Sequence, residues 1–257
     1  MDTPVLNCIK NRRSLRTFDS RMIQDDVLDA ILHAATRAPS AANLQLYSIL
    51  VIKDSKTKAV LAETCNHQPW IAKAPVLLVF CADYQRLYDF YTYSAVPQAC
   101  TFNGISFLRP QEQNLLLAEC DAMIAAQNAV LAAESMGIGS CYIGHIMDHF
   151  ELHKDLLQLP RYVFPVTLLA MGYPRERTGP LPVSPRLPAD YVIFRETYHQ
   201  LSEEELNDCY SRLPLPPTQN RYHAQNRGQY HYLKRHMNSN CYQEGVRSVK
   251  AALKQWN

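Results

Sequence analysis

Arg12, Arg13, Ser14 and Arg16 place three guanidinium groups and one hydroxyl within five consecutive residues, directly after a short helical pattern. A guanidinium is a planar fork that can bind two phosphate oxygens at once, and a serine hydroxyl adds a further donor. A solvated basic turn has the same composition, so the cluster alone leaves both interpretations open. If this cluster binds a ligand, the ligand is expected to carry a phosphate.

A second polar cluster, which contains Ser40, Asn43 and Gln45, lies between a helical pattern and a strand pattern. Polar residues beside a proline are common in turns, but amide side chains can also donate to and accept from the edge of a heteroaromatic ring. The two clusters follow one another in the order cation cluster, helix, amide cluster, strand. A phosphate-binding cluster followed by an amide cluster predicts a pocket for flavin mononucleotide (FMN), and therefore redox chemistry.

Other motifs carry weaker signals. The glycines of residues 137–144 depart from G-x-G-x-x-G spacing and follow a helical pattern, so they do not predict a dinucleotide-binding loop. His145, His149 and His153 are spaced four apart, and one continuous helix would place them on a single face that could chelate a metal. No glutamate follows His145 as in H-E-x-x-H, and we expect a mixture of packed and exposed histidines with no metal site. Cys141 is interpreted as a buried strand residue because nothing nearby in sequence lowers its pKa.

The segment 221–236 interleaves tyrosine and histidine with arginine and lysine. Nucleic-acid binders combine aromatic and cationic side chains in this way, but a polar tail that wraps a partner subunit has the same composition. The second interpretation is favoured, because the net charge of the chain is only +2 and such a charge makes neither nucleic acid nor an anionic membrane the expected partner.

Composition fits a soluble globular chain of 257 residues, with 47% apolar and 19% charged residues. The eight cysteines contain no C-x-x-C pair, so we expect free thiols in a reducing compartment. No signal peptide is visible, and the longest apolar runs fall far short of the roughly 20 residues that span a bilayer. We therefore predict a cytoplasmic protein that does not bind a membrane.

Hydrophobic periodicity predicts the elements that position these clusters. Expected helices and strands are Pro4–Asn11, a helix beginning at Asp25 and ending before Pro39, strands Leu46–Ile52 and Val76–Phe80, helix Gln111–Met136, strand Cys141–Ile143, helix Phe150–Leu159, strand Phe164–Met171, a helix from Ser202, and a last helix that contains Val246 and Trp256. The first two strands are continuous apolar runs, so helices should cover both of their faces. The aromatic segment 84–110 has little period and is expected to be a long excursion or lid, and the proline-rich residues 174–190 should run extended.

Five motifs in order resemble the FMN-dependent nitroreductase family: RRSLRTF, APSAANLQ, DAMIAAQNAVLAAESMGIGSCYIG, MGYP and SPRLP. They cover roughly residues 5–200. The stretches 66–83 and 232–256 are similar to the longer NADPH-dependent nitro and flavin reductase branch of that family. The resemblance implies an α+β fold with a mainly antiparallel central sheet flanked by helices. It also implies a homodimer with the flavin site at its interface, an FMN-binding domain over residues 1–200, and a C-terminal helical extension over residues 201–257 that is exchanged onto the partner subunit.

The resemblance assigns the site residue by residue. The FMN phosphate and ribityl chain would be bound by Arg12, Arg13, Ser14 and Arg16, and the ring or ribityl hydroxyls by Ser40, Asn43, Gln45 and Gln68. Ile143, Gly144 and His145 would lie along one face of the ring. Arg186 would be a further phosphate cation, and Lys234 or Arg235 would meet the 2′-phosphate of NADPH. The chain departs from the family pattern at Ser184, where relatives often have lysine, and at His145, where many have a second glycine.

The implied activity is NAD(P)H:acceptor oxidoreduction, in which hydride passes through flavin N5 in a ping-pong sequence to nitroaromatics, quinones or flavins. The flavin carries the reactivity and the protein supplies binding and electrostatics. No side chain is required as an acid or base, so no catalytic residue is assigned. Two alternatives remain open: a flavin-binding redox sensor without turnover, and a member of the same family that resembles reductive dehalogenases.

Overall fold

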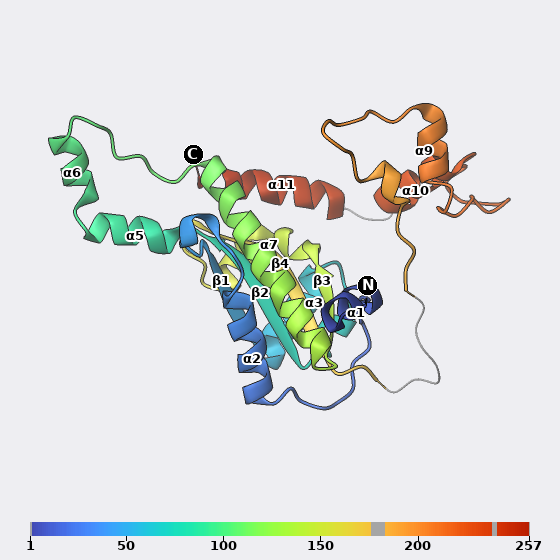
Figure 1. Cartoon of the computed structure of the whole chain (residues 1–257), viewed down its shortest axis with the longest axis horizontal. Coiled ribbons are helices and arrows are strands. Elements are labelled where there is room, and N and C mark those ends of the chain that lie inside the picture. Colours follow the sequence, from blue (N-terminus) through green and yellow to red (C-terminus); the bar gives the residue numbers. More distant parts are fainter. Residues whose placement is uncertain (1, 176–182, 238–240, 257) are drawn as a thin grey trace. The chain divides into compact units, whose positions relative to one another are not determined.

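The structure is a computed structural model that describes residues 2–175, 183–237 and 241–256. The chain divides into two compact units, residues 1–181 with 244–257 and residues 182–243. The first unit contains the sheet and the helices that cover it (Figure 1). The proline-rich run predicted to be extended lies partly outside the described residues.

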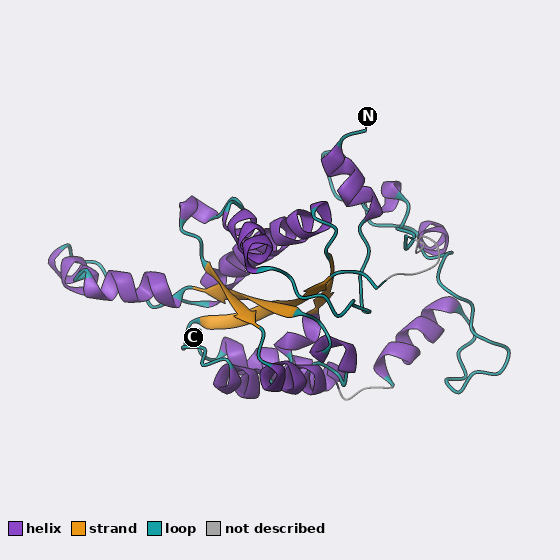
Figure 2. Ribbon diagram, turned by 90° about the horizontal axis from the view of Figure 1, so that it is seen from below, coloured by secondary structure: helices purple, strands orange, loops and turns teal. Residues whose placement is uncertain are grey.

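Four antiparallel strands form the sheet in the order β1-β2-β4-β3. They are β1 (Tyr47–Ile52), β2 (Val76–Asp83), β3 (Gly139–Ile143) and β4 (Val163–Gly172). Every residue of β2 and β4 is buried, because these strands are central and helices lie on both faces (Figure 2). The predicted antiparallel sheet is thus confirmed. The prediction that both faces of the first strand are covered holds in part. Tyr47 and Ile52 of β1 are buried in the cores on opposite faces of the sheet, but β1 is an edge strand and Val51 is 42% exposed.

Helices α1 (Pro4–Asn11), α2 (Asp25–Thr36) and α7 (Glu112–Ser135) form one side of the first unit. Thr3 caps α1 by accepting a hydrogen bond from the N–H of Leu6, and two aspartates open α2, where they favour the helix dipole. The alanines of α7 let its backbone approach the sheet closely. This helix is long and apolar enough to cross a membrane, but here it packs on β2, as a core helix does.

The opposite face of the sheet is covered by α3 (Ser55–Thr64) and α4 (Pro69–Ala72), followed in the chain by the short 3₁₀ turn η2 (Gly144–Met147) and α8 (Phe150–Leu156). Leu61 of α3 and Ile71 of α4 are completely buried against Val79 and Leu168 of the sheet. Helices α3 and α4 were not singled out by the sequence pattern, because α4 has only four residues and α3 buries only Leu61 and Ala62. The loop that joins them, residues 65–68, ends at Gln68, the N-cap of α4.

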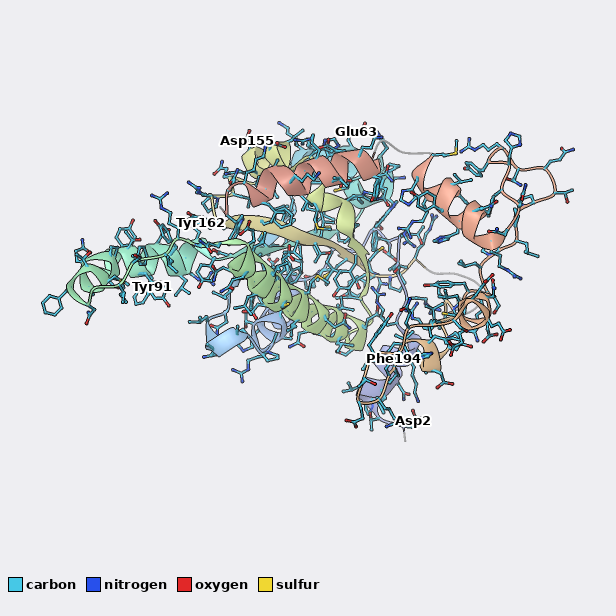
Figure 3. All side chains as sticks on the ribbon, turned by 90° about the horizontal axis from the view of Figure 1, so that it is seen from above. Asp2, Glu63, Tyr91, Asp155, Tyr162 and Phe194 are labelled. Atoms are coloured by element: carbon cyan, nitrogen blue, oxygen red, sulfur yellow. The ribbon has the colours of Figure 1, made fainter. Side chains whose placement is uncertain are left out.

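Segment 84–110, predicted to be a long excursion or lid, leaves the sheet as helical structure, which the sequence pattern did not predict. It contains two helices, α5 (Gln85–Tyr93) and α6 (Val96–Phe102), separated by Ala95 in the left-handed region at φ 56°. The two helices extend away from the sheet, with Tyr91 on α5 and Tyr162 near the point where α5 leaves it (Figure 3). Phe90 and Tyr93 stay 62% and 88% exposed, which explains why no helical apolar stripe was visible in the sequence.

The second unit contains the turn η3 (Ala189–Tyr191) and the helices α9 (Glu203–Cys209) and α10 (Arg227–His236). Ser202 and Glu205 form a reciprocal capping box on α9, as expected from a helix beginning there. Asn226 caps α10, a helix that the sequence pattern did not predict.

The last helix is α11 (Cys241–Leu253). Within the single chain, residues from Glu244 onward cluster with the first unit. The assignment of residues 201–257 to an extension exchanged onto the partner subunit stays a prediction. Ser248 accepts a hydrogen bond from the N–H of Phe150 at 2.8 Å, and Trp256 is buried with an edge-to-face contact to Tyr162. In the single chain, the apolar residues Ala252 and Trp256 of this terminal stretch are buried.

Candidate cofactor site

A pocket lies beside the end of β3, at one edge of the sheet. Its lining comes from the segment after α1, from the α3–α4 loop and from β3 with η2: Arg16, Asn66, Gln68, Trp70, Cys141, Tyr142, Ile143, Gly144 and His145. Five of the residues predicted to bind FMN therefore meet around one cavity of ≈ 240 Å³. They come from three regions of the sequence, and only the fold brings them together.

The cation cluster reaches this pocket by pairing with β3. The N–H of Leu15 donates to the carbonyl oxygen of Ser140 at 2.9 Å, and Ser14 and Ser140 form a parallel bridge. A side chain at Gly139 would place its Cβ 2.6 Å from Leu15 Cδ2, so glycine is required for this close approach. Leu15 is buried and anchors the cluster, while Arg16 on the far side of it is exposed toward the pocket.

Arg12 carries the strongest sign of a missing anionic ligand. Its Nε and Nη2 atoms are buried and have no hydrogen-bond partner among the described residues. The guanidinium lies 5.6 Å from the ring centroid of Tyr142. Leaving buried donors unpaired costs about 1–3 kcal/mol each, so a ligand with phosphate oxygens fits this position. This chemistry matches the phosphate end of FMN.

Glu134 of α7 was not predicted and lies close to the cation cluster. Burial raises its pKa, whereas the positive charges of Arg12 and Arg13 lower it. A carboxyl group in this position limits the net positive charge of the cluster in the absence of an anion. Its only signal in the sequence was a glutamate in an otherwise alanine-rich helix.

Cys141 lies under the cluster and is 1% exposed. Burial raises the pKa of its thiol, and this effect outweighs the opposing effects of Arg16 and Ser14. The interpretation of Cys141 as a buried strand residue is therefore confirmed, and the thiol is not poised as a nucleophile.

Gln68 is held by its own loop. Its Nε2 donates to the carbonyl oxygen of Cys65 at 2.7 Å, and its Oε1 accepts from Trp70 Nε1 at 3.2 Å. The guanidinium of Arg16 lies 5.8 Å from the Trp70 ring centroid. Gln68 thus fixes the wall of the pocket and keeps one amide hydrogen for a ligand.

The amide cluster lies elsewhere. Ser40, Asn43 and Gln45 surround the 3₁₀ turn η1 (Ala41–Asn43), which leads directly into β1. Because β1 and β3 are opposite edges of the sheet, these three residues do not line the pocket beside β3 in the same chain. Within one chain, the residues predicted to bind FMN therefore lie in two separate places.

Two residues that the sequence analysis did not identify hold this turn in place through hydrogen bonds to its main chain. Asp121 of α7 is 2% exposed and accepts from the N–H groups of Ala41 and Leu46, at 3.0 and 3.1 Å. Arg86 donates to the carbonyl oxygens of Gln45 and Tyr47. A single aspartate within a long alanine-rich run was the signal that could have identified the first of them.

The backbone of the turn is unusual. Ala42, Asn43 and Gln45 all have positive φ, at 48°, 58° and 45°. Such conformations persist only where the surroundings enforce them, and they cluster at functional sites. Gln45 Nε2 donates to Asn43 Oδ1 at 2.8 Å, so the two amides are already ordered relative to each other.

The three histidines do not share a helical face. His145 lies in η2, and His149 has φ 51° at the start of α8, which breaks any continuous helix between them. Within the described ranges, no group of three histidine, cysteine, aspartate or glutamate side chains could hold a metal ion. His153 is completely buried, with Nδ1 2.8 Å from the carbonyl oxygen of Ile146 and Nε2 2.7 Å from Thr64 Oγ1.

Arg186, Lys234 and Arg235 belong to the second unit. Lys234 Nζ lies 5.6 Å from the ring centroid of Tyr230, and the carbonyl oxygen of Arg186 accepts from Arg212. Their roles toward FMN phosphate and NADPH stay predictions.

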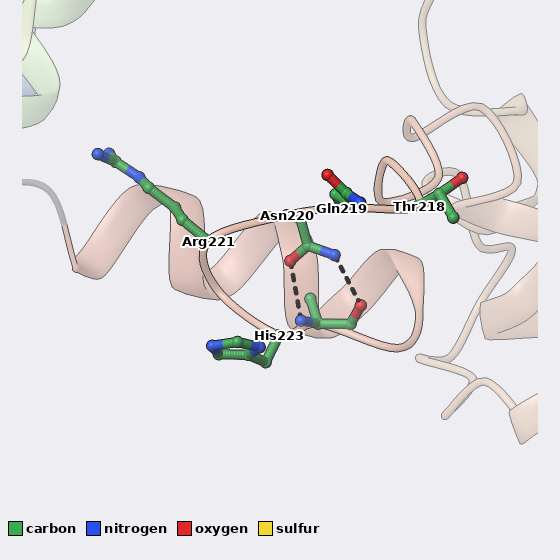
Figure 4. A pocket seen from close by; sticks show the side chains of 6 residues that line it. Thr218, Gln219, Asn220, Arg221 and His223 are labelled. Carbon is green, nitrogen blue, oxygen red and sulfur yellow. Dashed lines mark hydrogen bonds between the residues drawn. The ribbon is translucent and has the colours of Figure 1, made fainter.

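In the same unit, the side chain of Asn220 forms hydrogen bonds with both the N–H and the carbonyl oxygen of Ala224, which closes a small polar loop (Figure 4).

Comparison with known proteins agrees with this arrangement. The model of the family described as "Nitroreductase family" matches residues 9–173. The chain is 34% identical over 209 residues to the FMN reductase [NAD(P)H] of Bacillus subtilis, which covers 79% of this chain and 76% of the relative. It is 32% identical over 204 residues to the oxygen-insensitive NADPH nitroreductase of Salmonella typhimurium, covering 79% and 78%.

The solved structure of the NADPH:FMN oxidoreductase from Vibrio harveyi in complex with NAD+ is similar over 98% of both chains, with a TM-score of 0.76 and 25% identity. The family model, the sequence relatives and the structural similarity thus confirm the predicted family and fold class. This chain belongs to the nitroreductase family.

Proposed function

We propose that this chain is an FMN-dependent NAD(P)H:acceptor oxidoreductase that reduces nitroaromatics, quinones or flavins. The observation that carries the proposal is the pocket beside β3, which Arg16, Gln68 and residues 143–145 line. The buried, unpaired donors of Arg12 lie beside Tyr142, another residue of its lining. The names of the relatives, FMN reductase and NADPH nitroreductase, support the same cofactor and reaction class.

The residues of this chain bind and orient the cofactor. Arg12, Arg13, Ser14 and Arg16 supply the charge and donors for the phosphate, and the family resemblance adds Arg186 as a further phosphate cation. The wall formed by Gln68 and Trp70 limits the position of the ring and excludes water from one side. When bound, FMN supplies the hydride chemistry, taking two electrons from NAD(P)H and giving them to the acceptor.

The complete site is proposed to form in a homodimer. The cation cluster and the amide cluster occupy opposite edges of one sheet, so a second copy is needed to bring Ser40, Asn43 and Gln45 of one subunit to the pocket of the other. Exposed apolar side chains on α7 support such an interface, because Leu116 and Met123 are 61% and 41% exposed in the single chain. Partial exposure of this kind is expected where a partner subunit packs.

The donor is proposed to be NADPH, bound through Lys234 or Arg235, with NADH as the alternative. The seven cysteines whose state the structure describes are free thiols, which supports a reducing compartment and hence the cytoplasm.

An absorption spectrum of the freshly purified protein, recorded before and after anaerobic addition of NADPH, tests this function. Oxidised-flavin bands that bleach with NADPH and return on addition of a quinone are the expected result. A protein that stays colourless after reconstitution with FMN contradicts the cofactor. A flavin that binds but is not bleached contradicts the enzyme and favours a redox sensor.

A further inference from the structure

His145 and Asp148 form an ordered pair at the cofactor pocket. His145 Nδ1 lies 2.7 Å from Asp148 Oδ2, and the histidine side chain is 39% exposed while the aspartate side chain is only 10% exposed. His145 lines the pocket together with Arg16 and Gly144. Within the described parts of the chain, nothing is hydrogen-bonded to Nε2, so this nitrogen is available to a bound molecule.

The aspartate of this pair is fixed in place. Its main-chain N–H donates to the carbonyl oxygen of His145 at 3.1 Å. Gly245 of α11 packs directly against it, since a Cβ at that position would lie 2.9 Å from Asp148 Oδ1. Ser248, one turn further along α11, donates to the carbonyl oxygen of Met147 at 2.5 Å. These contacts fix the carboxylate in hydrogen-bonding distance of the imidazole of His145.

This arrangement determines which nitrogen of His145 can exchange a proton with a ligand. A carboxylate accepts hydrogen bonds and does not donate them when ionised. Nδ1 must therefore carry hydrogen in both the neutral and the charged imidazole. The mobile proton is left on Nε2, the nitrogen without a protein partner.

We propose, on the basis of the function proposed above, that His145 is the proton donor to the electron acceptor and that Asp148 is its positioning residue. A quinone that takes up a hydride becomes a hydroquinone monoanion. The Nε2–H bond of His145 then breaks, an O–H bond forms on the anion, and the neutral hydroquinone leaves. The neutral imidazole recovers its proton from water, so the enzyme returns to its starting state.

Other ionisable groups face the pair from the elements packed against it. Burial raises the pKa of Cys141, that of Tyr142 to about 12 and that of Cys65 to about 12, so these groups stay neutral. Burial also lowers the pKa of His153, which stays uncharged over most of this range. Arg16 is charged throughout. On the other side of Asp148, His149 pairs with Glu244 of α11.

The test separates the two halves of the reaction by stopped-flow absorbance of bound FMN. His145→Gln removes the transferable proton but keeps a polar side chain. It should slow reoxidation by p-benzoquinone about 10²-fold at pH 6 and remove the decline in that rate as the pH rises. Reduction by NADPH should be unchanged, and so should reoxidation by ferricyanide, which takes up electrons without a proton. His149→Gln is the matched control and should behave like the wild type.

Asp148→Asn should slow quinone reoxidation less than His145→Gln, with an altered pH profile, because the imidazole keeps its place but loses its fixed tautomer. A second readout needs neither cofactor nor turnover: the ¹⁵N chemical shifts of His145 in FMN-free protein at pH 8. We expect the Nδ1–H tautomer in the wild type and a shift toward Nε2–H in Asp148→Asn.

The proposal is overturned if His145→Gln is reoxidised by the quinone at the wild-type rate at every pH, or if wild-type His145 carries its proton on Nε2. Failure of the proposed function gives a different result. In that case FMN is not retained or is not bleached by NADPH in the wild type, while the tautomer of His145 can still be measured.

Discussion

Asp121 accepts a hydrogen bond from the main-chain N–H of Leu46 at 3.1 Å, across 75 residues of sequence. Its second oxygen accepts from Ala41 at the other end of the same turn. One buried carboxylate on α7 therefore fixes both ends of the segment that carries Ser40, Asn43 and Gln45. The amide half of the site is positioned by the core helix of the fold.

The first prediction concerns this carboxylate. Asp121→Asn keeps the shape, but an amide can accept at only one of its two positions and leaves one buried N–H unpaired. We expect a loss of about 1–3 kcal/mol in the free energy of unfolding and weaker FMN binding. Urea unfolding and fluorescence titration of FMN measure the two effects. Asp29→Asn, on the exposed side of α2, is the control, and equal behaviour of the two variants would show that the turn does not depend on Asp121.

The second prediction concerns Arg12 of the cation cluster. Arg12→Met replaces a guanidinium with two unpaired buried nitrogens by an apolar side chain of similar length. The FMN-free protein should become equally stable or more stable, because the desolvation cost of those donors disappears. FMN binding should weaken by about 1.5–3 kcal/mol, the value of a hydrogen bond to a charged group. Thermal unfolding with and without FMN separates the two effects, and a variant that retains FMN as tightly as the wild type argues against the phosphate assignment.

Most of the elements of the first unit could be predicted from sequence, because their signals are local. The acidic start of α2, the alanine-rich α7 and the apolar runs of β2 and β4 each follow from periodicity and composition. Helices α5 and α6 could not be predicted in this way, because Phe90 and Tyr93 are exposed and leave no apolar stripe.

The candidate site was predictable as a list of residues and not as an arrangement. The cation and amide clusters were visible as motifs, but their placement on opposite edges depends on the strand order β1-β2-β4-β3, which no local pattern records. Asp121, Arg86 and the pair formed by His145 and Asp148 were missed as positioning groups for the same reason. Each acts through contacts set by tertiary packing.

The third prediction tests the nucleotide donor. NADPH and NADH differ only in the 2′-phosphate, so removal of cations that bind it should affect one donor selectively. The double variant Lys234→Ala, Arg235→Ala is expected to raise KM for NADPH more than KM for NADH. Lys56→Ala, Lys73→Ala removes the same charge from exposed positions of the first unit and is the control. An equal increase of both KM values would contradict the assignment.

The fourth prediction concerns the end of the chain. Trp256 is 1% exposed and its ring centroid lies 5.5 Å from that of Tyr162. Trp256→Ala should destabilise the fold by about 3–5 kcal/mol, and Trp256→Phe by less. Tyr242→Ala, at a 61% exposed position of the preceding helix α11, should have little effect in the same urea titration. If all three variants unfold like the wild type, residues 244–256 do not pack on their own chain in solution.

The last prediction is a pH dependence of stability that arises from His153. Burial lowers the pKa of this imidazole below its usual value, whereas in the unfolded chain it titrates near about 6.5. Above that value both states are neutral, and the full stability is present. As the pH falls below it, the unfolded state takes up the proton first, so the free energy of unfolding decreases toward the folded pKa. Protonation would also oppose the buried contact with Thr64.

Urea unfolding of the wild type and His153→Gln between pH 5 and 8 measures this effect. The wild type should lose stability toward pH 5, and His153→Gln should start from a lower stability at pH 8 but show a shallower decline. His33→Gln, at an exposed position of α2, should retain the wild-type slope. A decline of equal slope in all three proteins would place the titrating group elsewhere, because the prediction attributes the decline to the buried imidazole of His153, whose pKa burial lowers.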